Sequence, residues 1–301
     1  MPSSLQLDEQ TATGSRDSLL LDYTRIRNDS ESICAPLQTE DYCIQTMPDV
    51  SPAKWHLAHT SWFFETFLLL PFLKNYRCHD AAYDHLFNSY YLTHGTPFSR
   101  PSRGLLSRPT VAEIYQYRKA VDEAMHTLFT NAADASWPEI EALVVLGLNH
   151  EQQHQELILT DLKHVFALNP LRPCYSELPQ AQTHTVKKIS WQPFTEGIYE
   201  TGHEGDGFCF DNELPRHRLW QQAFALASRP VTNAEYIQFI EDGGYKDPAL
   251  WLSDGWATAQ VNAWHAPLYW EQRDDEWWYM TLGGMRPVDM NAPVCLSLIH
   301  I

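Results

Sequence analysis

Apolar residues recur at helical spacing through the first 170 positions of the chain and in short runs after about position 185. Residues 17–34 repeat apolar positions at intervals of three and four, which predicts an amphipathic helix. A second helix is predicted to begin with Ser51 as its cap and Pro52 in its first turn. Its apolar pattern continues until Pro71, where we expect the helix to end.

Two later helices carry capping-box sequences at their predicted starts. Thr110 and Glu113 open one helix, and Ser136 and Glu139 open another that continues towards Asn169. A long connection rich in Gly, Pro and Ser precedes the first of them. Four long helices joined with one long crossover predict a helical bundle.

The pattern of residue types along the sequence changes at about residue 185. Short β-type runs (KKISWQPF, GIYETG, HRLWQQAFALAS) alternate with Gly, Pro, Asn and Asp, and a short helix is predicted at 233–241. We therefore expect an α+β protein of several domains. The expected segments are a disordered N-terminus at 1–16, a helical domain at 17–180 and the start of a second domain at 181–295.

Composition and charge exclude several classes of protein. With 44% hydrophobic and 20% charged residues, the chain has the composition of a folded protein. Its formal net charge of −17 argues against nucleic acid and against an anionic membrane as partners. The six cysteines contain no CxxC pair, and we expect them to be reduced. Neither a signal peptide nor a membrane span is apparent, so we expect a cytoplasmic protein.

The last six residues, 296–301, have an unusual sequence. LSLIHI is the translation of a transposase end sequence used in sequencing libraries. We expect these residues to be adapter read-through and the natural gene to continue past about Cys295, the alternative being a genuine tail.

The strongest chemical signal is the run HEQQHQE at 150–156. His150 and His154 are four residues apart, so both imidazoles lie on one helical face and can point at one ion. The apolar residues assigned to the same face are Leu143, Leu146 and Leu157. They place the pair towards the bundle interior, where two unpartnered histidines would be costly. Alone, the HxxxH spacing is equally compatible with a structural role.

A third interior histidine favours a metal site. His59 shares a helical face with Trp55 and Trp62, so it can converge with His150 and His154 across the core of a bundle. Three neutral imidazoles suit a borderline divalent metal such as Fe, Zn, Co or Ni.

Neighbouring polar residues have open alternatives. His56 competes with His59, and we expect it to support the site or to be structural; His164 lies too far along its helix to share the ion. Glu156 is either an acceptor for a ligating histidine or a solvated charge.

Four residues are candidates for substrate binding. Arg100, Arg103 and Arg108 lie within nine positions, and arginine binds carboxylates with two parallel hydrogen bonds, so this cluster suits a small anionic metabolite. An internal salt-bridge network is the alternative. Gln153 lies between the two histidines and can point its amide into the same cavity.

Five separated motifs resemble the hercynine oxygenases, the sulfoxide synthases of ergothioneine biosynthesis. They are WHLAHTSWFFE, FNSYYLTHGTPFSRPSRGLLSRP, GLNHEQQHQELILTDLKHVFALNPLRP, FDNELPRHRLWQQAFALASRPVTNAEYIQFIEDGGY and LWLSDGW, in the family's order over residues 17–294. The resemblance implies a DinB-like four-helix bundle followed by a formylglycine-generating-enzyme-like domain of the C-type-lectin class, incomplete in this chain. It also implies Fe(II) on His59, His150 and His154.

The resemblance further implies a reaction. Such enzymes join the sulfur of cysteine or γ-glutamylcysteine to the imidazole of hercynine, the trimethylammonium betaine of histidine, using O2. By motif, Gln153 contacts the hercynine side, and Arg100 and Arg103 hold the carboxylates of the thiol substrate. The family's catalytic tyrosine belongs beyond the end of this chain, so no tyrosine here is assigned that role and the activity of the chain alone stays open.

Three alternatives remain at this stage. The related 5-histidylcysteine sulfoxide synthases of ovothiol biosynthesis use histidine as the acceptor. A DinB-type thiol transferase with zinc or another divalent metal is a second alternative, although such a bundle does not need the PVTNAEY domain. A catalytically inactive module that binds a metabolite is the third.

Overall fold

The computed structural model describes residues 15–89, 95–177 and 185–296. Within them the chain divides into two compact units, 15–169 with 205–210 and 170–204 with 211–296. Residues 1–14 of the expected disordered N-terminus, the expected boundary between residues 180 and 181, and residues 297–301 of the suspected read-through lie outside the described residues.

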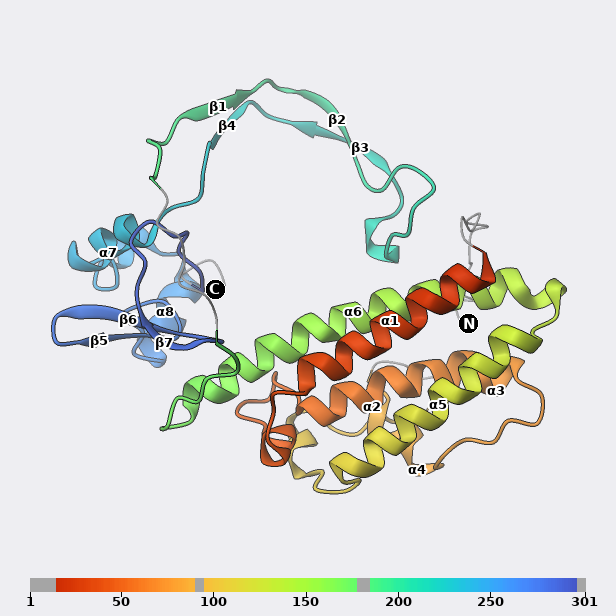
Figure 1. Cartoon of the computed structure of the whole chain (residues 1–301). Coiled ribbons are helices and arrows are strands. Elements are labelled where there is room, and N and C mark those ends of the chain that lie inside the picture. Colours follow the sequence, from red (N-terminus) through yellow and green to blue (C-terminus); the bar gives the residue numbers. More distant parts are fainter. Residues whose placement is uncertain (1–14, 90–94, 178–184, 297–301) are drawn as a thin grey trace. The chain divides into compact units, whose positions relative to one another are not determined.

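The N-terminal unit is built around four long helices, as the apolar spacing predicts (Figure 1). They are α1 (Arg16–Cys34), α2 (Ala53–Phe64), α5 (Val111–Asn131) and α6 (Trp137–Leu168). Helix α6 packs against both α1 and α2, and α5 packs against α2 and α1. The core between them is aromatic and aliphatic, with Tyr23, Phe64, Met125 and Val144 buried completely.

Helix α2 lies at the centre of this unit and is buried along its whole length. Its start differs from the prediction, because Pro52 occupies the cap position and the Ser51 side chain does not cap the helix. Instead, the Ser51 hydroxyl accepts a hydrogen bond from Arg103. The helical path continues through a π-helical segment, η2 (Glu65–Leu69), into α3 (Leu70–Phe72), so it ends one residue after the predicted Pro71.

The two predicted capping boxes have different outcomes. Thr110 accepts from the backbone of Glu113 while Glu113 accepts from the backbone of Thr110, so the box at the start of α5 is confirmed. At the start of α6, Ser136 makes no side-chain cap hydrogen bond. Ser136 ends the 3₁₀ turn η5 (Asp134–Ser136) with helical backbone angles, φ −96° and ψ −9°. An N-cap side chain normally requires an extended backbone, so the prediction for Ser136 is wrong.

Short elements occupy the connections between the long helices. They are η1 (Thr39–Cys43), α4 (Ala82–Phe87) and η4 (Arg100–Leu105). The last two lie in the long connection between α2 and α5, where the sequence predicted a loop. They place Phe87 next to His59 and Arg103 next to Trp55, and both of these partners are on α2.

The C-terminal unit consists of short strands and two helices, which confirms the α+β class. Its elements are β1 (Trp191–Phe194), β2 (Gly197–Thr201), η6 (Asp211–Glu213), β3 (His217–Gln221), β4 (Phe224–Ala227), α7 (Asn233–Glu241), η7 (Pro248–Leu250), α8 (Ser253–Val261), β5 (Trp270–Arg273), β6 (Glu276–Thr281) and β7 (Gly284–Pro287). Antiparallel pairs join β1 to β4 and β2 to β3, and β5, β6 and β7 form a three-stranded meander (Figure 1). The predicted helix at 233–241 is confirmed.

Two further expectations concern the whole chain. All six cysteines are free thiols, as predicted. Within the described part of the chain, no helix combines the length and the apolar character needed to cross a membrane.

Candidate metal centre

Helices α2 and α6 face each other and bring three histidines together. His59 comes from α2, and His150 and His154 come from successive turns of α6. One nitrogen of each ring lies within 4.8 Å of a nitrogen of each other ring; His59 and His154 are buried and His150 is half-buried. We call these three residues the histidine cluster.

The close approach of α2 and α6 depends on a glycine one turn before His150. A Cβ added to Gly147 would lie 2.6 Å from the Phe64 ring and 2.9 Å from the Phe63 ring, which is too close for either contact. Any larger residue would therefore separate the helices near the histidine cluster.

The buried stripe of α6 is not the one predicted from sequence. It includes Val144, Leu148, Glu151 and Ile158, whereas Leu143 and Leu146 are partly exposed and Leu157 is 39% exposed. His150 therefore lies at the border of the buried stripe, and His154 lies within it. The border position gives the histidine cluster a buried side and an open side.

Hydrogen bonding fixes the orientation of His59. Its Nδ1 lies 2.5 Å from the carbonyl oxygen of Phe87, which only accepts, so Nδ1 carries the proton and Nε2 presents a lone pair. That Nε2 lies 3.2 Å from the Nε2 of His150. Two nitrogens bound to one ion at about 2.1 Å lie roughly 3.0 to 3.4 Å apart at octahedral to tetrahedral angles. This pair of rings therefore fits a shared metal ion.

His154 is tied to two residues outside the histidine cluster. Its Nδ1 lies 2.8 Å from Nδ1 of His56, and Nε2 of His56 lies 3.0 Å from a carboxylate oxygen of Asp161. The same oxygen accepts the backbone N–H of Ser51 at 2.8 Å. His56 thus supports His154 rather than joining the cluster. Asp161 lies seven residues after His154, a spacing that returns to the same helical face and is the signal that could have found it.

The environment keeps the rings of the histidine cluster uncharged. Burial lowers the pKa of His59 and His154 well below the ordinary value, and the positive charge of Arg103 lowers both further. Burial also lowers the pKa of His150, to about 4. Neutral imidazole is the form that binds a metal ion, so all three rings suit that role at neutral pH.

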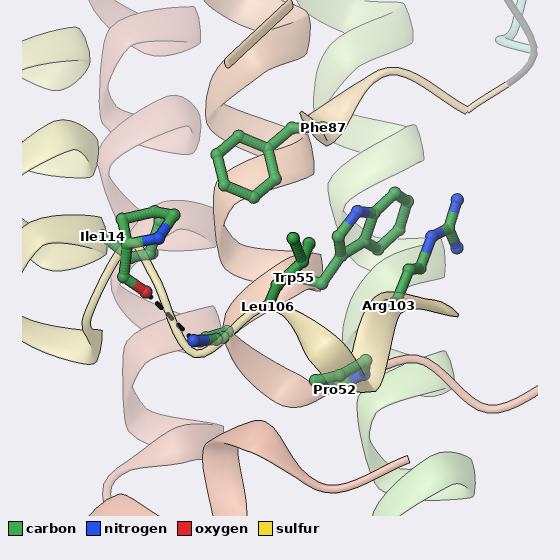
Figure 2. Close-up of a pocket in the computed structure, with 8 residues that line it drawn as sticks. Pro52, Trp55, Phe87, Arg103, Leu106 and Ile114 are labelled. Atoms are coloured by element: carbon green, nitrogen blue, oxygen red, sulfur yellow. Dashed lines mark hydrogen bonds between the residues drawn. The ribbon is translucent and has the colours of Figure 1, made fainter. Parts of the chain in front are cut away.

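Arg103 reaches the histidine cluster through an aromatic stack. Its guanidinium lies 3.3 Å from the centre of the Trp55 ring, and Trp55 stacks on His59 with ring centres 4.6 Å apart. Arg103 is only 4% exposed, and its named hydrogen-bond acceptors are the hydroxyls of Ser51 and Ser89. Figure 2 shows Arg103 and Trp55 at one side of a small pocket whose further lining includes Phe87, Leu106 and Ile114.

The other candidate residues lie further out. Arg100 is exposed and donates to the carbonyl of Asp49, and Arg108 is exposed and donates to the carbonyl of Ser107. Gln153 and Glu156 are also exposed on α6. His164 is buried but bonds to Thr46, away from the histidine cluster. Of the three predicted arginines, Arg103 is the one that the structure links to the histidine cluster, through its contact with Trp55.

Sequence reasoning missed a buried group of charges directly beside the histidine cluster. Glu151 is completely buried and accepts from Arg27 at 2.9 Å, from Ser30 at 2.7 Å and from Arg118. Burial alone would raise the pKa of Glu151, but Arg118 and Arg27 outweigh it and hold the pKa at about 2. We call Arg27, Arg118 and Glu151 the ion cluster.

Comparisons with known families agree with this architecture. The sequence profile of the DinB superfamily matches residues 22–158, which include the histidine cluster. The profile of the sulfatase-modifying factor enzyme 1-like domain matches residues 176–292. These matches define the class of protein: a DinB-type helical domain followed by a sulfatase-modifying-factor-like domain.

The relatives of the chain include several hercynine oxygenases. The chain is 29% identical to a hercynine oxygenase of Mycobacterium tuberculosis over 76% of this chain and 52% of that protein. It is 34% identical to a hercynine oxygenase of Mycolicibacterium smegmatis over 42% of this chain and 29% of that protein. It is 28% identical to ergothioneine biosynthesis protein 1 of Neurospora crassa, over 48% of this chain and 18% of that protein. With both domains in order, the chain fits the hercynine oxygenase family.

The match covers only part of these relatives. The chain spans about half the length of the curated hercynine oxygenases that it matches over most of its own length.

Proposed function

We propose that the chain is part of an oxidoreductase of ergothioneine biosynthesis, a sulfoxide synthase that acts on hercynine and a cysteine thiol. The hydrogen of an imidazole C–H and the hydrogen of the thiol S–H are replaced by one C–S bond. The sulfur also gains one oxygen atom of O2, and the other oxygen atom leaves as water with both hydrogens. The four electrons released reduce O2, so the reaction balances without another reductant. The names of the relatives support this proposal.

The observation that carries the proposal is the histidine cluster. Three rings that are neutral at pH 7 converge from two helices, and one pair has the nitrogen spacing of ligands on a shared ion. We assign Fe(II) to His59, His150 and His154. An iron(II) ion with three imidazole ligands keeps open positions for substrates and can pass electrons to O2.

Arg103 is proposed to bind the carboxylate of the thiol substrate. Its guanidinium carbon lies 3.3 Å from the centre of the Trp55 ring, a contact that restrains the donor group before the substrate arrives. Trp55, which Arg103 contacts, stacks on His59 with ring centres 4.6 Å apart, so a carboxylate bound to Arg103 would bring the rest of the substrate close to the histidine cluster. Arg100 is proposed as a second, outer contact for the same substrate, and Gln153 as a contact on the hercynine side.

The domains are assigned on the same basis. Residues 17–180 are proposed to carry the metal centre, and residues 181–295 to be the N-terminal part of a formylglycine-generating-enzyme-like domain. No residue of this chain is assigned as the catalytic tyrosine.

Two measurements test the proposal. The chain is loaded anaerobically with Fe(II), and we expect about one iron per chain after removal of excess metal. To the complete protein, of which this chain is proposed to be a part, hercynine, O2 and either cysteine or γ-glutamylcysteine are then added, and mass spectrometry follows the sulfoxide product. The preferred thiol identifies the second substrate, and histidine in place of hercynine separates this reaction from its ovothiol counterpart. A chain that binds no iron contradicts the proposed metal centre.

A further inference from the structure

Asp161, His56 and His154 form a continuous hydrogen-bonded chain behind the histidine cluster. Asp161 lies on α6 two turns after His154, and His56 comes from the facing helix α2. The two contacts measure 3.0 Å between Asp161 and His56 and 2.8 Å between His56 and His154. His56 is 2% exposed and His154 is 8% exposed, so water does not compete for these ring nitrogens.

The direction of each hydrogen bond follows from the chemistry of the groups. An ionised aspartate only accepts, and its Oδ2 already accepts the backbone N–H of Ser51, so Nε2 of His56 must donate to it. In the neutral form of the ring the other nitrogen is then an acceptor, so the Nδ1–H of His154 donates a hydrogen bond to Nδ1 of His56. His154 is thereby left with its lone pair on Nε2.

We infer that Asp161 and His56 are positioning residues that hold His154 in the tautomer and ring orientation in which Nε2 is free to bind a metal ion. This inference rests on the proposed function, because it assumes that His154 is a ligand. The carboxylate of Asp161 acts on His154 through the imidazole of His56. Asp161 and His154 both belong to α6, whereas His56 belongs to α2.

The same logic distinguishes His154 from its two neighbours. The Nδ1 of His59 is held by the carbonyl oxygen of Phe87, which belongs to the backbone and is not removed by substitution. The Nδ1 of His150 is buried without a hydrogen-bond partner among the described residues. His154 is therefore the ring of the histidine cluster whose Nδ1 hydrogen bond depends on replaceable side chains, those of His56 and Asp161.

The test measures Co(II) affinity of the full chain from the visible absorption of the bound ion. Loss of a hydrogen-bonding partner behind a metal ligand typically weakens metal binding by about 10- to 100-fold. We expect a weakening of this size for Asp161→Ala and for His56→Phe, with a changed Co(II) spectrum. Since both changes break one chain, the double variant should bind no more weakly than the weaker single variant.

Controls separate orientation from general damage to the bundle. His164→Phe replaces another buried histidine of α6, one that bonds to Thr46, and should leave Co(II) affinity within about twofold of wild type. Asp161→Asn keeps an oxygen that can accept from both Ser51 and His56, so it should bind Co(II) more tightly than Asp161→Ala. If Asp161→Ala does not fold, the comparison of Asp161→Asn and His56→Phe with wild type takes its place.

Three outcomes decide the question. Unchanged Co(II) affinity in His56→Phe and in the Asp161 variant that folds, or additive losses in the double variant, overturn the inference. If His59→Ala loses Co(II) binding while His56→Phe and the folded Asp161 variant bind Co(II) normally, only this inference is overturned. The proposed metal centre is then unaffected. Normal Co(II) binding in His59→Ala overturns the metal centre itself.

Discussion

Two polar clusters lie side by side on α6, and they differ in the partners that their polar groups meet. His150 belongs to the histidine cluster and Glu151 to the ion cluster, so the two environments meet at consecutive positions of the helix. In the ion cluster every charge meets an opposite charge, because Glu151 lies between Arg27 and Arg118. In the histidine cluster like groups face each other, with Nε2 of His59 and Nε2 of His150 only 3.2 Å apart.

The difference is the basis for assigning a structural role to the ion cluster and for proposing a ligand site at the histidine cluster. A buried carboxylate between two guanidinium groups has its hydrogen bonds satisfied within the protein. Two neutral imidazole nitrogens that face each other can share at most one proton, and a metal ion satisfies both. Changes in the ion cluster should therefore act on stability, and changes in the histidine cluster on metal binding.

The largest expected effect is the loss of metal binding from the histidine cluster. His150→Ala or His154→Ala should abolish Fe(II) binding, because each removes one of three ligands. Stability of the metal-free chain should fall only modestly, since the helices keep their apolar faces. Metal content after anaerobic loading and desalting, together with urea unfolding, measures both effects. Iron retained at the wild-type level in both variants would contradict the assignment.

The second effect concerns the ion cluster. Glu151→Ala leaves Arg27 and Arg118 buried without their shared carboxylate, and breaking a buried ion pair costs about 3 to 5 kcal/mol of unfolding free energy. Glu31→Ala is the matched control, because Glu31 also pairs with Arg118 but is 41% exposed. It should cost no more than about 1 kcal/mol. Urea unfolding measures both variants. Equal losses of unfolding free energy would contradict the prediction that the buried ion pair contributes more than the exposed one.

The third effect is the pH dependence of stability. The pKa of Glu151 is about 2 in the folded chain, below its value of about 4.3 in unfolded chains. A lowered folded-state pKa adds stability above the unfolded value, and that stability is lost as the pH falls from about 4.3 towards 2. The loss should amount to about 3 kcal/mol. Glu151→Gln should lack this component, so parallel profiles for wild type and Glu151→Gln would contradict the ion-cluster assignment.

Much of the bundle could be predicted because its helices follow local rules. The spacing of apolar residues located α1 and α6, and the capping box at Thr110 formed as predicted. Ser51 and Ser136 failed as caps for separate reasons. Ser51 is taken up by tertiary contacts with Arg103 and Asp161, whereas Ser136 belongs to a preceding 3₁₀ turn. Local propensity cannot anticipate either outcome.

The site itself was predictable only where spacing determines it. Four-residue spacing puts His150 and His154 on one face, and the aromatic neighbours of His59 place it in the core. Their supporting contacts join residues about 100 positions apart, such as His56 with Asp161. Glu151 was missed because a charged residue within a helix is usually solvated, and nothing local indicates that two arginines from other helices surround it.

The smallest expected effect is on substrate affinity at Arg103. This residue shares features with the ion cluster but has different hydrogen-bond partners. Like the arginines of the ion cluster it is buried, but its named hydrogen-bond partners are hydroxyls and its face lies on Trp55. Arg103→Ala should weaken binding of the thiol substrate by about 1.5 to 3 kcal/mol, the range for hydrogen bonds to charged groups. Hercynine binding should change little. Titration of each substrate into the Fe(II)-loaded protein measures both.

Arg103→Lys sharpens this prediction because it keeps the charge and removes the planar fork. A lysine ammonium offers a point charge and cannot stack flat on Trp55, so only part of the lost affinity should return. Arg108→Ala is the control, since Arg108 is exposed and its named contact is the carbonyl of its neighbour Ser107. If Arg103→Ala and Arg103→Lys both unfold the protein, or weaken both substrates equally, Arg103 belongs with Arg27 and Arg118 as a structural charge. The carboxylate of the thiol substrate must then be bound elsewhere.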